Sequence, residues 1–197
     1  MMYRNRCQLL VVEGHDAAGK ATQSKLLARN LQLHGINAVR VEVPCLNRRW
    51  SYRLIYWMLR NGWAKRLPNV FQLVQFANKL AFQLWELPKL ARDHEVVVLD
   101  RWNLSSVVYG LATGTNRWFV MFLYGLLRSA DRTLVLSGRS FPRAGADTYE
   151  ADSDLQVRVK QGYLAWAEAH PEDCIVVRND RTVADVQQDM LRASGAL

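Results

Sequence analysis

The feature that most constrains this chain is a glycine-bounded loop between an apolar run and a polar helical segment. Residues 14–20 read Gly-His-Asp-Ala-Ala-Gly-Lys and follow the apolar residues 9–12. Such a loop exposes main-chain N–H groups to an anion, and the next helix aims its positive dipole end at the same point. Lys20 adds a charge that can reach the β- and γ-phosphates of a nucleotide. The sequence therefore predicts a phosphate-binding loop in the first strand–helix unit.

The residue after this lysine departs from the usual pattern of such loops. Position 21 is alanine, where a serine or threonine hydroxyl normally binds Mg²⁺, and the hydroxyl comes one position late at Thr22. Thr22 substitutes for that ligand only if the start of the helix is shifted. The alternative explanation of the whole segment is a chance glycine turn before a helix.

Length and composition indicate a folded chain with a substantial core. The 197 residues suit one domain, and a hydrophobic content of 50% excludes disorder as a global description. The net charge of +8 suits nucleotides and phosphates as well as DNA, and it is equally compatible with a role in solubility alone.

Cysteine usage and hydropathy point to the cell interior. Cys7, Cys45 and Cys174 are far apart and show no paired spacing, which favours a reducing compartment and argues against zinc. The longest apolar run, residues 118–127, is about half of the ~20 residues that a membrane span needs. We expect a soluble, cytoplasmic protein without a membrane partner, in which Cys7 and Cys174 are small core residues and the 118–127 helix is buried.

Strand and helix patterns alternate along the chain. Predicted strands cover residues 7–12, 38–43, 95–100, 132–137 and 174–178. Predicted helices cover residues 20–34, 52–61, 69–92 (capped by Asn69 and interrupted at Pro88), a segment from 104, 118–128, 152–169 and 183–193. This order predicts an α/β protein with a parallel five-stranded sheet, helices on both faces, and ligands at the carboxyl ends of the strands.

A second group of polar residues follows the most strand-like run of the sequence. Residues 95–99 end in Asp100 and Arg101, followed by Ser105, Ser106 and Tyr109. A carboxylate at the end of a strand beside a phosphate loop suits Mg²⁺, and the neighbouring guanidinium can bind two phosphate oxygens. The alternative is an ordinary Asp–Arg ion pair that caps the helix starting at residue 104.

Together these motifs resemble the thymidylate kinase family. The matches are Glu-Gly-x-Asp-x-Ala-Gly-Lys at 13–20, Asp-Arg-aromatic-x-x-Ser-Ser-x-x-Tyr at 100–109, and Asp-Thr-Tyr-Glu at 147–150 with Arg158 and Gln-Gly-Tyr at 161–163. The resemblance covers nearly the whole chain, from Gln8 to about Met190. It implies a three-layer P-loop NTPase fold in one domain, 1–197, with a short lid at about 138–150.

The resemblance also implies roles for individual residues. The donor ATP would contact Gly14, Ala17, Ala18, Gly19, Lys20, Ala21, Thr22 and Arg139. The acceptor would contact Asp16, Arg53, Gln75, Lys79, Arg101, Ser106, Tyr109 and Tyr163. Catalysis would rest on Lys20, Asp16, Arg101 and the lid residue Arg143, and Asp100 and Thr22 would hold Mg²⁺. Because position 17 is alanine, a lid arginine must supply charge to the transferring phosphoryl group.

The implied activity is transfer of the γ-phosphoryl of ATP to dTMP or a related 5-substituted deoxyuridine monophosphate. Family members form homodimers, and no nucleic acid is expected as a partner. Two acceptor-side positions depart from the family: Gln75 stands where phenylalanine usually stacks on thymine, and Gly110 where glutamine is frequent. His15 is expected to face solvent. The alternatives are a catalytically weak nucleotide-binding homologue with a regulatory or assembly role and, less favoured, a nucleic-acid-binding protein.

Overall fold

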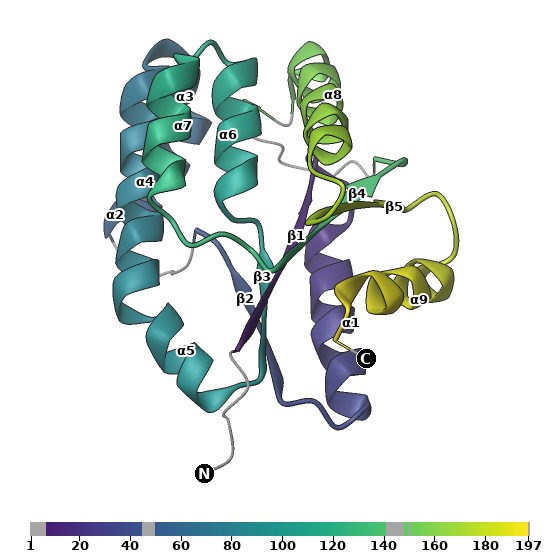
Figure 1. Cartoon of the computed structure of the whole chain (residues 1–197). Coiled ribbons are helices and arrows are strands. Elements are labelled where there is room, and N and C mark those ends of the chain that lie inside the picture. The colour runs from purple at the N-terminus through teal and green to yellow at the C-terminus, as the bar shows by residue number, and fades with distance from the viewer. Residues whose placement is uncertain (1–6, 45–49, 141–147, 150, 197) are drawn as a thin grey trace.

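A computed structural model describes residues 7–44, 50–140, 148–149 and 151–196. Its centre is a parallel five-stranded sheet of order β2-β3-β1-β4-β5 (Figure 1). The strands are β1 (Gln8–Gly14), β2 (Ala38–Glu42), β3 (Val96–Asp100), β4 (Arg132–Ser137) and β5 (Cys174–Arg178). All five predicted strands are therefore confirmed, each within two residues of its expected bounds.

The central strands alternate their side chains between two separate cores. Leu9 and Val11 of β1 pack with the core under the long middle helices, whereas Leu10 and Val12 pack with the core on the opposite face. Both faces of β1 and β3 are covered, which accounts for the continuous apolar runs at residues 9–12 and 96–99. The register pairs Val12 with Asp100, which brings the two polar motifs together at one edge of the sheet.

Helices cover both faces of the sheet. They are α1 (Lys20–Leu33), α2 (Trp50–Arg60), α3 (Trp63–Arg66), α4 (Pro68–Trp85), α5 (Leu87–Asp93), α6 (Asn103–Ala112), α7 (Arg117–Gly125), α8 (Ser153–Ala169) and α9 (Val183–Ser194). Figure 1 shows α1 and α9 together on one side and the group from α2 to α7 on the other. None of the described helices is long and apolar enough to cross a membrane.

Two expectations about the helices are wrong, and one is confirmed. The interruption near Pro88 is confirmed, because α4 ends at Trp85 and α5 begins at Leu87. The expected cap by Asn69 is wrong: α4 starts at Pro68, and proline suits the first turn because the N–H it lacks would have no partner within the helix. The short α3 was not predicted. The apolar 118–127 segment is only partly buried, since Trp118 is 82% and Phe122 68% exposed.

Other expectations concern cysteines and the lid. Cys7 and Cys174 are buried, as predicted. Cys45 lies outside the described residues, and so do most positions of the expected lid.

A buried carboxylate joins the centre of the sheet to the elements above it. Glu13 is fully buried near the end of β1. It accepts hydrogen bonds from the backbone N–H of Trp102 (2.8 Å) and Ser105 (3.1 Å) and from the Tyr163 hydroxyl (3.0 Å). Burial and the nearby Glu13 charge raise the pKa of Tyr163, so its hydroxyl remains a donor. Glu13 thus ties β1 to the start of α6 and to α8.

Replacing Glu13 by alanine is expected to lower the free energy of unfolding by about 3 kcal/mol or more, because three buried donors lose their acceptor. Urea denaturation at neutral pH measures the change. Glu168→Ala, on the exposed surface of α8, is the control and should stay within about 0.5 kcal/mol of the parent chain. Equal effects of the two substitutions would contradict the role given to Glu13.

Candidate nucleotide-binding site

The predicted phosphate loop connects β1 to the N-terminus of α1. Gly14 has a φ of 144°, and a Cβ at this position would lie 2.6 Å from the carbonyl oxygen of Leu136 on the neighbouring strand. Ala17 and Gly19 also adopt positive φ values, 59° and 81°. The loop therefore bends tightly into the helix, and the expected donor residues from 14 to 21 lie in one continuous turn.

Asn179 holds this loop against the first residues of the expected lid. Its side-chain amide donates to the carbonyl oxygens of Ala18 (2.8 Å) and Arg139 (2.9 Å), and it accepts from the Arg139 N–H (2.7 Å). The backbone of Arg139 is thus fixed beside the phosphate loop, while Arg143 lies outside the described residues. Asn179 follows the last strand and carried no signal in the sequence.

Lys20 is buried at the base of the loop. Its Nζ donates to the carbonyl oxygen of His15, and burial together with the charge of Arg101 lowers its pKa to about 7. The expectation that His15 faces solvent is wrong: the residue is 3% exposed, and its Nδ1 donates to the carbonyl oxygen of Asp16 (2.7 Å). An anion bound in the loop would therefore raise the pKa of Lys20 and keep its side chain charged.

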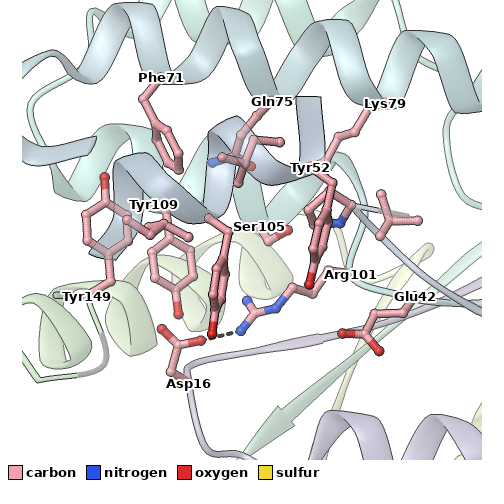
Figure 2. A pocket seen from close by; sticks show the side chains of 15 residues that line it. Asp16, Glu42, Tyr52, Phe71, Gln75, Lys79, Arg101, Ser105, Tyr109 and Tyr149 are labelled. Carbon is pink, nitrogen blue, oxygen red and sulfur yellow. Dashed lines mark hydrogen bonds and ion pairs between the residues drawn. The ribbon is translucent and has the colours of Figure 1, made fainter. Parts of the chain in front are cut away.

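Asp16 and Arg101 form an ion pair between the phosphate loop and the end of β3 (Figure 2). The same carboxylate accepts from the Gln156 side-chain amide (2.9 Å), whose oxygen in turn accepts from the Asp16 N–H (2.9 Å). Burial raises the pKa of Asp16, but Arg101 and Lys20 lower it more strongly, to about 2. Asp16 is therefore ionised at neutral pH, and Arg101, at a φ of 69°, projects its guanidinium toward the pocket beyond.

An aromatic pocket opens beside this ion pair. Tyr109 stacks on Tyr149 with ring centroids 5.9 Å apart, and Phe71 meets Tyr149 edge-on at 6.0 Å. The lining residues are Asp16, Glu42, Val43, Pro44, Tyr52, Ile55, Tyr56, Leu59, Phe71, Gln75, Lys79, Arg101, Ser105, Tyr109 and Tyr149. Figure 2 shows Gln75 and Phe71 descending from α4 toward Asp16 and Arg101. The pocket thus combines flat aromatic surfaces with a charged end.

Five of the eight expected acceptor residues line this pocket: Asp16, Gln75, Lys79, Arg101 and Tyr109. The other three lie elsewhere. Ser106 is buried behind the wall and Ser105 lines it instead, while Tyr163 is bonded to Glu13. Arg53 is exposed on α2 and is not part of the wall. Glu42, Tyr149 and Ser105 also line the pocket, although none of them was among the expected acceptor residues.

Lys79 is a second buried cation, behind the floor of the pocket. Its Nζ donates to the carbonyl oxygen of Trp102 and to the Ser106 hydroxyl, and burial lowers its pKa to about 7. The Ser106 hydroxyl in turn donates a hydrogen bond to Oε1 of Gln75 (3.2 Å). This chain of hydrogen bonds leaves the Nε2 donor of Gln75 available to the pocket.

The residues expected to hold Mg²⁺ do not fit that role. Thr22 is exposed on α1, and Ala21 has no side-chain oxygen. Asp100 is 4% exposed, and its Oδ2 accepts from the Arg40 guanidinium (2.5 Å) and from the Ser24 hydroxyl (3.4 Å). Within the part of the chain that the structure describes, no three His, Cys, Asp or Glu side chains gather to hold a metal.

Comparisons with known proteins give one consistent result. The chain is 27% identical to a probable thymidylate kinase of Thermococcus gammatolerans, covering 92% of this chain and 93% of that protein. It is 29% identical to a probable thymidylate kinase of Pyrobaculum aerophilum (91% and 94% covered) and to a thymidylate kinase of Dinoroseobacter shibae (93% and 94%). No protein-family model matches the sequence.

Solved structures agree with these relatives. The fold matches the thymidylate kinase of Candida albicans with a TM-score of 0.75 at 23% identity, covering 95% of this chain and 90% of that one. It matches the thymidylate kinase of Ehrlichia chaffeensis with a TM-score of 0.73 at 21% identity, covering 95% and 98%. The chain is a relative of the thymidylate kinases. The expected resemblance, the P-loop NTPase fold and the class of enzyme, a nucleoside monophosphate kinase, are confirmed.

The two buried lysines of this thymidylate kinase relative predict a distinctive pH dependence. Without bound anions, the free energy of unfolding should rise from about pH 7 to about pH 8.5. The folded state releases protons from Lys20 and Lys79 near pH 7, whereas the unfolded chain keeps them to about 10.5, so the unfolded state binds more protons in this window. Each lysine should contribute about 1–2 kcal/mol. At higher pH the raised pKa values of buried thiols and phenols act in the opposite direction.

Urea denaturation in a phosphate-free buffer measures this rise. Lys79→Met should remove about half of it, because one of the two lysines is lost. Lys89→Met, on the exposed surface of α5, should leave the rise intact. A stability that is flat or falls between these pH values in the parent chain would show that the lysines stay charged in the folded state.

Proposed function

We propose that this chain transfers the γ-phosphoryl of ATP to dTMP or a related 5-substituted deoxyuridine monophosphate, giving the diphosphate. The observation that carries the proposal is the Asp16–Arg101 ion pair, which lies between the phosphate loop and the aromatic pocket. On one side the loop suits the phosphates of a donor, and on the other the pocket suits a flat base. The relatives, named thymidylate kinases, supply the proposed acceptor.

The proposed mechanism follows from charge. Phosphoryl transfer spreads negative charge over the equatorial and bridging oxygens, and little covalent work falls to the protein. The main-chain N–H groups of the loop, Lys20 and Arg101 would hold two anions that otherwise repel each other. An acceptor phosphate is already an anion near neutral pH, so no general base is required. We assign the remaining charge to a lid arginine, Arg139 or Arg143.

Binding of the donor and acceptor phosphates would also stabilise the charged forms of the buried Lys20 and Arg101. Lys20, whose pKa is lowered to about 7 by burial, would regain its charge beside the donor phosphates. Arg101 would share its guanidinium between Asp16 and the acceptor phosphate, since its fork offers several N–H groups. The ion pair therefore presents Arg101 in a fixed direction before substrate arrives.

The setting and partners of the proposed enzyme follow its relatives. ATP is proposed to arrive as its Mg²⁺ complex, with the metal held by phosphate oxygens and water. We propose a homodimer, and the exposed Trp118 and Phe122 of α7 offer apolar surface that a second copy would cover. The buried, unpaired thiols of Cys7 and Cys174 suit a cytoplasmic location.

Lys20→Ala and Arg101→Ala are each expected to lower kcat with ATP and dTMP about a hundredfold or more. Each substitution removes a cationic side chain that would stabilise the negative charge on the transferring phosphoryl group. A coupled assay of ADP release across pyrimidine monophosphates measures the rates. Lys25→Ala, on the exposed side of α1, serves as control and should retain the parent rate. A parent chain that turns over no pyrimidine monophosphate would refute the proposed function.

A second candidate function is a nucleotide-binding module with little turnover, used in regulation or assembly. Ala21 and the pairing of Asp100 with Arg40 favour it, because both remove expected contacts to the metal. Calorimetry separates the two: ATP binding without any diphosphate product after long incubation with Mg²⁺ would support the module and exclude the enzyme.

Gln75 is proposed to read the base of the acceptor. Because its Oε1 is occupied by Ser106, its Nε2 offers a donor to the pocket, which matches a keto oxygen of a uracil-type base and not the amino group of cytosine. Gln75→Glu replaces this donor by an acceptor. The ratio of kcat/KM for dTMP to that for dCMP should then fall about tenfold or more.

Steady-state rates with the two monophosphates measure this ratio. Gln75→Leu removes both the donor and the acceptor at similar size and is the matched control. It should lower kcat/KM for both monophosphates and change the ratio of the two values less than Gln75→Glu does. An unchanged ratio in Gln75→Glu would remove Gln75 from base selection while leaving the proposed reaction intact.

A further inference from the structure

The carboxylate that the family pattern assigns to Mg²⁺ is already engaged by a side chain of this protein. Arg40, in the middle of β2, crosses to Asp100 at the end of β3 and contacts its Oδ2 at 2.5 Å. The Asp100 side chain is 6% exposed and that of Arg40 24%, so the pair is largely withdrawn from solvent. A buried pair of this kind holds its geometry because separating it would leave an uncompensated charge.

The surroundings of Arg40 fix its guanidinium in place. Its Nε donates to the Ser24 hydroxyl (3.2 Å), and its NH2 group also contacts Glu42 (3.2 Å). Ser24 lies one helical turn after Lys20 and donates to the same oxygen of Asp100 (3.4 Å). Three elements, α1, β2 and β3, thus converge on one carboxylate oxygen.

The loop positions next to Lys20 offer no side-chain ligand to a metal. Ala21 has no side-chain oxygen, and Thr22, which has a hydroxyl, is exposed on α1. Asp100 acts electrostatically on both Lys20 and Arg101, which places it within the charge network of the phosphate site. A cation paired with Asp100 therefore contributes to the electrostatic potential at the phosphate site, where a nucleotide would bind.

We propose that Arg40 is a positioning residue that supplies, beside Asp100, the fixed positive charge that a bound metal would otherwise supply. The inference rests on the proposed function. It assigns the Asp100 carboxylate to Arg40 and not to the metal, so that among the residues expected to hold Mg²⁺ neither Asp100 nor Thr22 serves as a ligand, and the nucleotide's phosphates and water hold the ion. Arg40 acts through Asp100 and Ser24, and no direct contact with substrate is assigned to it.

The test compares how tightly Mn²⁺ binds to ADP free in solution and to ADP on the protein. Electron paramagnetic resonance of unbound Mn²⁺ gives both affinities, with no turnover involved. The parent chain should bind Mn²⁺ in the ternary complex no more tightly than free ADP does, and Asp100→Asn should leave the affinity within about twofold. A carboxylate that orients metal-bound water would instead lose about tenfold or more on this substitution, and that result would overturn the proposal.

Two substitutions of Arg40 give the reciprocal test. Arg40→Met frees the Asp100 charge and should tighten Mn²⁺ binding in the ternary complex about tenfold, whereas Arg40→Lys keeps a cation and should not. Arg178→Met removes an exposed arginine from its pair with Asp180 and is the control. An unchanged Mn²⁺ affinity in a folded Arg40→Met protein would contradict the proposal. If that variant does not fold, Arg40→Lys and Asp100→Asn still decide the question.

The outcomes separate this inference from the proposed function. A parent chain that binds neither ADP nor ATP refutes the proposed function, and the role of Arg40 falls with it. A chain that binds ADP and loses Mn²⁺ affinity in Asp100→Asn refutes only the role of Arg40.

Discussion

The buried carboxylate of Glu13 is the interaction on which the geometry of the site depends. It lies next to Gly14 at the end of β1 and accepts the first free N–H groups of the β3–α6 connection, at Trp102 and Ser105. The phosphate loop and the residues around Arg101 are therefore anchored to the same side chain. A kinase must keep donor and acceptor phosphates at a constant separation, and a shared anchor in the core sets that separation better than two independent loops would.

The same arrangement explains why so many cations are buried near one point. Lys20 and Lys79 both have pKa values lowered to about 7 by burial, and Arg101 remains charged through its pair with Asp16. Burial disfavours the charged form of each lysine, so a bound anion would stabilise the lysines as cations.

The sequence predicted the sheet well and the polar contacts less well. The strands could be predicted because buried parallel strands are continuous apolar runs. The start of α4 at Pro68 could not, because it depends on a proline in the first turn without a side-chain cap, which the hydrophobic pattern does not reveal. The pairing of Arg40 with Asp100 joins β2 to β3, neighbours in space that are distant in sequence. The choice between Ser105 and Ser106 depended on the exact orientation of α6, which only the packing against α4 determines.

These contacts also explain how the fold accommodates the alanine at position 21. Loss of the hydroxyl at position 21 would leave the Asp100 carboxylate without the cation that normally balances it. Arg40 provides that balance from within the protein, and Ser24 supplies a hydroxyl to the same oxygen from one turn further along α1. The two features are complementary: an alanine at position 21 without an arginine at position 40 would bury an unpaired carboxylate, which costs several kcal/mol (about 3–5). Arg40 and Ala21 are therefore best regarded as one unit of the phosphate site.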